Sequence, residues 1–291
     1  MPELPDIVVY QEALAARIVT HALERVRILN PFLLRTADPP IASVEGRSVT
    51  AIRRLGKRVV IALEGERFLV LHLMRAGRLR WLAPKAKPAK KITLAIFEFA
   101  NGHLAFTEAG TKRRASLHLV QGEAALQALD PGGLEVLDCD LAAFAARLTS
   151  ERHTLKRALT APSLFSGIGA AYSDEILFRA RLAPTTHTTT LKPEAIECLY
   201  TAARAVLSEW IGRLREAAQG EFPEGVTAFR EEMCVHGRFG KPCKVCGDPI
   251  QRIVYAETET NYCAQCQTGG RLLADRALSR LLHESWPKFL E

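Results

Sequence analysis

The first residues of the chain combine a nucleophile with a proton shuttle. Removal of Met1 leaves Pro2 as the N-terminal residue, and its secondary amine can attack an aldehyde-like sugar carbon to form an iminium. An α-amino group titrates near pH ~8 and a lysine near ~10.4, so far more of the former is unprotonated at neutral pH. Glu3 stands beside this amine as a candidate acid or base. This start favours Schiff-base chemistry, although a proline that merely precedes a helix is the simpler alternative.

Four cysteines near the other end of the chain have the spacing of metal ligands. Two Cys-x2-Cys pairs are separated by sixteen residues and comprise Cys243, Cys246, Cys263 and Cys266. Two such pairs can close a tetrahedral thiolate site, and strands expected at residues 250–255 and 260–262 can pair as a hairpin between them. We therefore predict one structural Zn²⁺ in a zinc ribbon, ahead of a redox pair or a catalytic metal. Cys139, Cys198 and Cys234 lack this spacing and are expected to be small buried thiols.

The charge balance points to a polyanionic partner. The net charge is +7 and the sequence pI is about 9.1. Residues 47–91 hold thirteen Lys and Arg against two acids, whereas residues 121–151 hold six acids and one basic residue. A basic face on the N-terminal part is the prediction, although the lysine-rich run at 85–91 also fits a solvated loop.

Composition excludes two broad classes of protein. No apolar run approaches the ~18–20 residues of a membrane span, and the acidic, proline-punctuated start does not resemble a secretory signal. Seven cysteines, odd in number and clustered at one end, suit a reducing compartment better than a disulfide scaffold. We expect an intracellular, cytoplasmic protein with no membrane partner.

The elements that must hold these residues change type along the chain. A helix is expected at residues 5–19, followed by seven short strands that suggest a β-sandwich or barrel: 26–29, 48–55, 59–63, 68–74, 78–82, 92–99 and 104–107. Residues 130–133 read as a linker. Helical periodicity then returns at 140–149, 154–161, 169–181, 192–218, 226–233 and, near the end, 271–283.

Several motifs in a fixed order resemble the formamidopyrimidine-DNA glycosylase/endonuclease VIII (Fpg/Nei) family. They cover nearly the whole chain: Pro2-Glu3-Leu4-Pro5; Arg53-Arg54-Leu55-Gly56-Lys57 on a strand; Leu71-His72-Leu73 followed by Gly77; Gly167-Ile168-Gly169-Ala170-Ala171-Tyr172-Ser173-Asp174-Glu175; and Gly237-Arg238 before Pro242-Cys243. Each motif alone is weak, but the ordered set is specific. The chain resembles a divergent member.

The resemblance implies an α+β multidomain fold. Its parts would be an N-terminal two-layer β-sandwich with flanking helices at 1–133, a helix–two-turn–helix DNA-binding domain at 134–238, and a zinc ribbon with a tail at 239–291. The family also suggests a monomer.

The resemblance further implies a DNA-repair glycosylase with AP-lyase activity on damaged DNA. Pro2 would attack C1′ of a nucleotide that has left the stack, Glu3 would act as acid and base, and Lys57 would contact phosphate and assist proton transfer. β- or β,δ-elimination would then cut the strand. Further DNA contacts are expected at Arg75, Lys112, Arg113, Arg114, Lys156, Gly169 and Arg238, most of them to the phosphate backbone.

Four positions depart from the family pattern. Ala170 replaces a common asparagine, and Arg75 stands where a methionine fills the gap of the flipped base, unless Met74 fills it. The segment 107–116 keeps its positive charge but lacks the family's phenylalanine. Thr258 and the acids beside it replace an arginine that grips phosphate. These departures predict a non-standard lesion preference, such as abasic, single-stranded, bulky or cross-linked damage.

Two alternatives stay open on the sequence alone. One is a non-catalytic damaged-DNA-binding protein on the same fold, which the four departures favour and which the retained Pro2, Glu3 and Lys57 oppose. The other is a generic zinc-ribbon binder of nucleic acid, which leaves the N-terminal motif unexplained. Borohydride trapping separates the enzyme from both.

Overall fold

The computed structural model describes residues 1–84, 86–110, 112–227, 229–255, 258–274, 281, 288 and 289. The chain forms two compact units. Unit 1 comprises Met1–Pro131 and Trp210–Thr227, and unit 2 comprises Gly132–Glu209 and Ala228–Glu291. The division falls within the longest helix, so unit 1 contains its last turns. The three-domain limits expected from the sequence stay a prediction.

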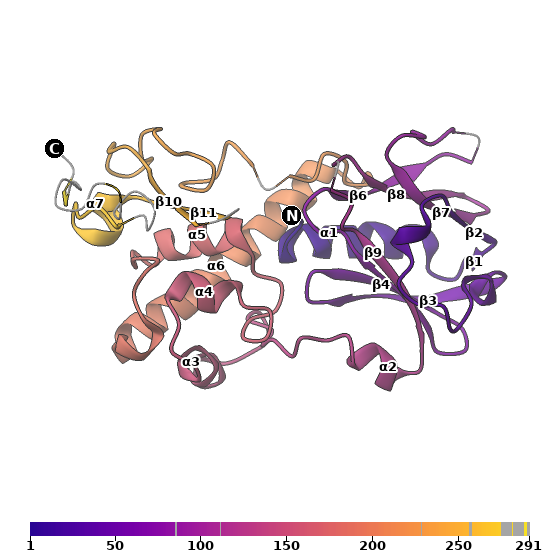
Figure 1. Ribbon diagram of the computed structural model, residues 1–291, viewed down its shortest axis with the longest axis horizontal. Coiled ribbons are helices and arrows are strands. Elements are labelled where there is room, and N and C mark those ends of the chain that lie inside the picture. The colour runs from indigo at the N-terminus through magenta and orange to yellow at the C-terminus, as the bar shows by residue number, and fades with distance from the viewer. Residues whose placement is uncertain are drawn as a thin grey trace. The chain divides into compact units, whose positions relative to one another are not determined.

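Unit 1 is a β-sandwich with a helix at its start (Figure 1). Helix α1 spans Leu4–Ile18, with Pro5 in its first turn, and packs on β3 and β4. The strands are β1 (Ala22–Leu23), β2 (Arg25–Ile28), β3 (Arg47–Leu55), β4 (Arg58–Leu63), β5 (Arg67–His72), β6 (Gly77–Leu82), β7 (Thr93–Phe99), β8 (Gly102–Glu108) and β9 (Ser116–Gln121). Short 3-10 helices span Pro31–Leu33 and Ile41–Val44, and helix α2 spans Glu123–Gln127.

The strands form two antiparallel sheets, ordered β1-β3-β4-β5-β9 and β2-β7-β8-β6. Successive side chains of β4 point to opposite faces of the first sheet, and because Val59–Leu63 are all apolar and buried, both faces are apolar here. Val59 and Ile61 enter the main core with Phe97 and Phe106 of the second sheet. Val60 faces the other way, into a smaller cluster that α2 covers. The two-layer sandwich predicted from the sequence is therefore confirmed.

Unit 2 begins with helices, as the sequence predicted. They are α3 (Leu141–Thr149), α4 (Leu155–Thr160), α5 (Ala170–Arg179) and α6 (Pro193–Ala218), with a 3-10 turn at Thr188–Thr190. Asp140 caps α3 by accepting a hydrogen bond from Ala143 N–H at 2.8 Å. Among the described residues, no helix is long and apolar enough to cross a membrane.

The C-terminal part of unit 2 carries the expected hairpin. Strand β10 (Gln251–Tyr255) pairs with β11 (Thr258–Tyr262), and the short helix α7 (Ala264–Thr268) follows. The helix expected at 271–283 falls mostly on residues 275–280, 282 and 283, which lie outside the described residues.

The helix predicted at 226–233 is wrong for the described residues of that segment. Three carbonyl groups of this segment accept hydrogen bonds from side chains instead of from the backbone of a next helical turn. Val226 O accepts from Arg78, while Glu231 O and Glu232 O both accept from Lys244 Nζ, at 3.0 and 2.9 Å. Tertiary partners therefore override the local periodicity.

Candidate functional site: an N-terminal amine, basic loops and a four-cysteine centre

Pro2 and Glu3 lead directly into α1. Both are buried, and only 2% of Glu3 is exposed. Glu3 is the N-cap residue, and Asp6 Oδ2 accepts a hydrogen bond from its backbone N–H at 2.9 Å. The buried aspartate thus fixes the backbone that carries the candidate nucleophile and acid.

Burial and four nearby charges act on the pKa of the N-terminal amine. Burial lowers the pKa of the Met1 amine below its ordinary value. Four charged side chains also act on this pKa: Glu3 and Asp6 raise it, while Arg78 and Lys57 lower it. A lowered pKa leaves more of the amine unprotonated and nucleophilic at neutral pH. Removal of Met1 transfers the amine to Pro2, one residue nearer to α1.

Lys57 lies in the two-residue turn between β3 and β4, whereas the sequence placed it on a strand. Gly56 precedes it with φ +61°, a left-handed conformation that glycine adopts without strain. The charge of Lys57 lowers the pKa of both the Met1 amine and His72. The turn therefore brings this cation near the N-terminus. The catalytic roles of Pro2, Glu3 and Lys57 stay predictions.

His72 ends β5 opposite Arg58 of β4. The pKa of His72 is lowered to about 4, mainly by burial and in smaller part by the charges of Arg58, Lys57 and His118. The imidazole is therefore neutral at pH 7, and it lies at the end of β5 near the cations Arg58 and Lys57.

The turn between β5 and β6 presents Arg75. Leu73 O accepts a hydrogen bond from Gly77 N–H at 2.8 Å, and a Cβ at Gly77 would lie 2.2 Å from that carbonyl oxygen, so only glycine fits. Met74 adopts φ +52° and is half-buried, while Arg75 is exposed. Arg75 is thus the side chain that this turn offers to solvent.

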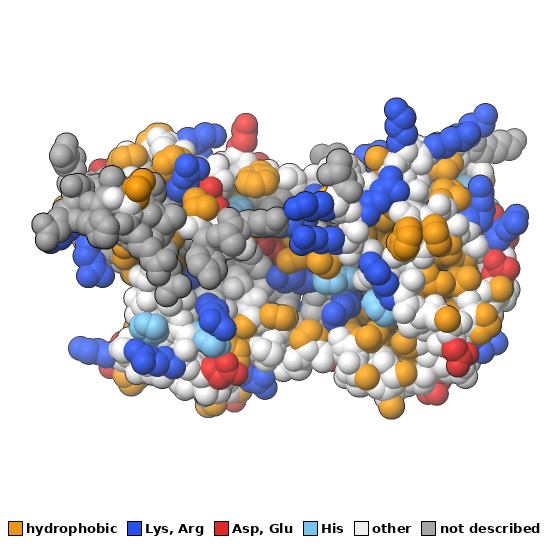
Figure 2. All heavy atoms as spheres, viewed as in Figure 1, with side chains coloured by type: hydrophobic (Ala, Val, Ile, Leu, Met, Phe, Trp, Pro, Cys, Tyr) orange, Lys and Arg blue, Asp and Glu red, His pale blue; other side chains and the backbone are white. Residues whose placement is uncertain are grey.

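A second loop, after β8, carries three consecutive exposed cations, Lys112, Arg113 and Arg114. The buried carboxylate of Glu108 shapes this loop by accepting hydrogen bonds from the N–H groups of Arg114 and Ala115, at 3.1 and 3.2 Å. Figure 2 shows several Lys and Arg side chains on the viewed face of unit 1. The basic face predicted from the sequence is consistent with this arrangement.

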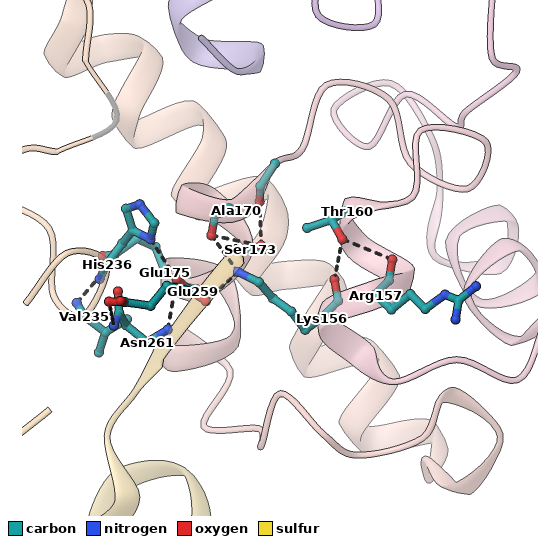
Figure 3. Close-up of polar contacts among 12 residues, drawn as sticks. Lys156, Arg157, Thr160, Ala170, Ser173, Glu175, Val235, His236, Glu259 and Asn261 are labelled. Atoms are coloured by element: carbon teal, nitrogen blue, oxygen red, sulfur yellow. Dashed lines mark hydrogen bonds and ion pairs between the residues drawn. The ribbon is translucent and has the colours of Figure 1, made fainter. Parts of the chain in front are cut away.

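Lys156 points into unit 2 instead of into solvent (Figure 3). Its Nζ donates to Asp174 Oδ1 at 2.5 Å and to Ala170 O at 2.6 Å. The two side chains of this ion pair are 15% and 0% exposed. The ammonium joins α4 to the N-terminal half of α5, and the DNA contact of Lys156 stays a prediction.

Helix α5 also binds the segment that precedes the cysteines. The Glu175 carboxylate accepts from three successive N–H groups, of Cys234, Val235 and His236, at 2.8 to 3.0 Å. Asp174 Oδ2 lies 2.7 Å from His236 Nδ1 and accepts from Asn261 N–H at 3.2 Å. Sequence reasoning quoted Asp174 and Glu175 only as part of a motif and missed this network.

Two further predicted DNA contacts lie in unit 2. Gly169 is the N-cap residue of α5, and its carbonyl accepts a hydrogen bond from Ser173 N–H at 3.1 Å. Arg238 is half-buried and donates to Pro242 O at 3.1 Å. Their contacts with DNA stay predictions.

The four predicted cysteines converge. Their sulfur atoms all lie within 4.8 Å of one another, with Cys243–Cys266 at 3.9 Å and Cys246–Cys263 at 3.4 Å. Zn–S bonds of ~2.3 Å in a tetrahedron require S–S distances of about 3.8 Å, so the donor set fits one Zn²⁺. This is the structural zinc centre predicted from the sequence.

The zinc hairpin carries an arginine, Arg252, on β10, whereas Thr258 lies on β11. Arg252 of β10 lies over the Phe239 ring, with its Cζ 4.2 Å from the centroid. Its guanidinium pairs with Glu259 at 3.6 Å, so one of the acids noted in the sequence is partly neutralised.

Comparisons with known proteins agree with this architecture. The formamidopyrimidine-DNA glycosylase N-terminal domain matches residues 1–114, the H2TH domain of that glycosylase matches 131–219, and the zinc finger found in FPG and IleRS matches 240–269. A sandwich with a buried N-terminus, a helix–two-turn–helix unit and a four-cysteine zinc finger define a class of DNA-repair glycosylases.

Relatives narrow the class to one family. The chain is 33% identical over 280 residues to the formamidopyrimidine-DNA glycosylase of Heliobacterium modesticaldum, covering 92% of this chain and 100% of the relative. It is 34% identical to that of Chloroflexus aurantiacus, covering 92% and 98%. The structure of Lactococcus lactis Fpg bound to DNA with an AP site matches with a TM-score of 0.80 and 25% identity over 91% of this chain and 99% of that one. The chain belongs to the formamidopyrimidine-DNA glycosylase family.

Proposed function

We propose that this protein excises oxidised or otherwise damaged bases from DNA and cuts the strand at the resulting abasic site. The observation that carries the proposal is the half-buried N-terminus, whose amine has a pKa lowered chiefly by burial and is acted on by the charges of Glu3, Asp6, Arg78 and Lys57. We also propose that the enzyme is cytoplasmic and acts on DNA as a monomer.

In the proposed reaction, the amine of Pro2 attacks C1′ of the extruded nucleotide. The N-glycosidic bond breaks, and the base leaves with the proton that the attacking amine loses. Glu3 donates a second proton to the ring oxygen, so that the C1′–O bond breaks and the sugar opens to an iminium. Loss of a C2′ proton then expels the 3′ phosphate, and a second elimination can expel the 5′ phosphate. Lys57 would hold phosphate beside the reacting sugar.

We further propose an unusual lesion preference. Arg75 is the exposed side chain of its turn, the 107–116 segment offers cations without an aromatic wedge, and Ala170 opens α5 without an amide. These residues favour polar contacts over apolar insertion. Relatives of known structure bind Fapy-dG or oxidised pyrimidine in DNA, so both lesions belong in a substrate panel.

The test is borohydride trapping of the untagged protein on oligonucleotides that contain an abasic site, 8-oxoguanine or an oxidised pyrimidine. Each is offered as single and double strands. We expect a covalent adduct with wild type and at least about a hundredfold less with Pro2→Gly, because the nucleophile is changed.

An uncleaved N-terminal tag is the matched control, since it leaves every side chain in place but blocks the amine. Binding without any adduct in wild type would instead support the non-catalytic damaged-DNA-binding alternative. Ordinary trapping by Pro2→Gly would refute the nucleophile.

A further inference from the structure

The guanidinium of Arg78, on β6, donates hydrogen bonds to three backbone carbonyl groups. Its Nη1 donates to Gly77 O at 2.6 Å and to Arg75 O at 3.2 Å, and its Nε donates to Val226 O. Only arginine among the basic side chains has several donors in a fixed planar fork. The residue thus binds two segments that lie about 150 residues apart in the sequence.

The first segment is the β5–β6 turn, which presents Arg75. Arg78 binds the carbonyl groups at its tip and at its end, so the turn is held in addition to its own Leu73–Gly77 hydrogen bond. The positive φ of Met74 makes this extra restraint relevant, because a non-glycine residue disfavours that conformation.

The second segment, residues 219–227, follows α6 and packs on the sandwich. Phe222 lies 5.7 Å from Tyr10 between ring centroids, and Val226 is part of the main core. Arg17 donates to Gly220 O at 3.3 Å at the start of the segment. The bond from Arg78 to Val226 O anchors its other end.

Both segments meet near the N-terminus. Tyr10, which lies on α1, exchanges hydrogen bonds with the backbone of Leu79, next to Arg78. The charged groups that act on the N-terminal amine come from three elements: Glu3 and Asp6 at the start of α1, Lys57 in the β3–β4 turn, and Arg78 on β6. Arg78 therefore holds the backbone near the N-terminus through its hydrogen bonds, and its charge acts on the N-terminal amine.

We propose that Arg78 is a positioning residue for the Schiff-base step, which ties the β5–β6 turn and the Val226 segment together beside the N-terminal amine. This inference rests on the proposed function. Arg78 does not form a bond to substrate in this scheme. It fixes the backbone around the amine and places a positive charge that disfavours protonation of that amine.

The test measures the rate of borohydride trapping between pH 5 and 9 for wild type, Arg78→Gln and Arg78→Lys. Arg78→Gln should slow trapping about tenfold and move the pH midpoint upward by about half a unit, because a nearby positive charge is lost. Arg78→Lys should keep the wild-type midpoint but trap more slowly, because lysine retains the charge and loses the fork.

Arg80→Gln is the matched control, since Arg80 is an exposed arginine two residues further along β6. It should trap like wild type, with an unchanged midpoint. Thermal unfolding of each variant establishes that the fold is retained. Wild-type rates and midpoints in both Arg78 variants, or equal effects of Arg80→Gln, would overturn the proposal. A wild-type protein that gives no adduct would instead defeat the proposed function.

Discussion

At the scale of the residue, the ionisable groups of the sandwich derive their chemistry from burial and from neighbouring cations. The Met1 amine and His72 both have a lowered pKa, and in both cases burial is the largest cause. Lys57 contributes to both. One half-buried lysine in a turn therefore influences a candidate nucleophile and a histidine on a neighbouring strand.

The His72 pKa of about 4 predicts a pH dependence of stability. In the unfolded chain, His72 becomes protonated below its ordinary pKa of ~6.5, whereas in the folded chain it becomes protonated only near pH 4. The free energy of unfolding should therefore fall as pH decreases from 6.5 towards 4. Urea titrations of wild type and His72→Gln at pH 7 and pH 5 check this.

In His72→Gln, the loss of stability between the two pH values should be smaller than in wild type. His21→Gln removes another histidine of the same unit and should leave the wild-type dependence in place. An identical pH dependence in wild type and His72→Gln would contradict the assignment.

At the scale of the element, α5 joins the helical part of unit 2 to its zinc hairpin. Asp174 and Glu175 accept hydrogen bonds or ion pairs from α4, from the segment 234–236 and from β11. All these groups are backbone N–H donors, Lys156 or His236. Adjacent acids on a single helix therefore hold three other segments in place.

Lys156→Met tests this role. The variant removes the lysine partner of Asp174 Oδ1 and leaves the buried carboxylate with only its Oδ2 partners, His236 and Asn261 N–H, so we expect the free energy of unfolding to fall by about 3 kcal/mol. Adding Asp174→Asn should recover part of that loss, because the buried charge that has lost its lysine partner is gone. Denaturant unfolding measures both variants.

Lys192→Met is the matched control, since Lys192 is an exposed lysine of the same unit. It should change the stability little. A Lys156→Met protein of wild-type stability with weakened DNA affinity would contradict the structural role and favour the phosphate contact expected from the sequence.

The sequence predicted the elements whose pattern is local. Strand β4 and the zinc hairpin follow from apolar runs and cysteine spacing, and α5 from its helical period. Strand β9 was missed, although Leu117 and Leu119 alternate into the core as they do in a half-buried strand. The helix expected at 226–233 failed because its carbonyl groups are bound by side chains distant in sequence.

The same distinction applies to the candidate site. Pro2 and the four cysteines are recognisable from position and spacing alone. Arg78 bonds to a carbonyl 148 residues away, and Asp174 pairs with His236 across 62 residues. No local pattern encodes such contacts, so only the fold brings them into view.

At the scale of the whole molecule, the net charge of +7 leaves the protein attracted to a polyanion. Two basic stretches of unit 1 are candidates for the main contact with DNA phosphates. One is the loop at 112–114, which Glu108 orders. The other is residues 87–91, the last part of the lysine-rich run at 85–91 that also fits a solvated loop.

The salt dependence of DNA binding separates the two stretches. Each phosphate contact contributes about 0.9 to the slope of log K against log salt. Replacing Lys112, Arg113 and Arg114 by alanine should reduce the slope for duplex DNA with an abasic-site analogue by about two, because exposed cations that release counterions are lost. The same change at Lys87, Lys90 and Lys91 keeps the Arg113 hydrogen bond to the Lys91 carbonyl, removes as many charges and should reduce the slope by less than one. Equal reductions would show that net charge alone, and not the ordered loop, determines the affinity.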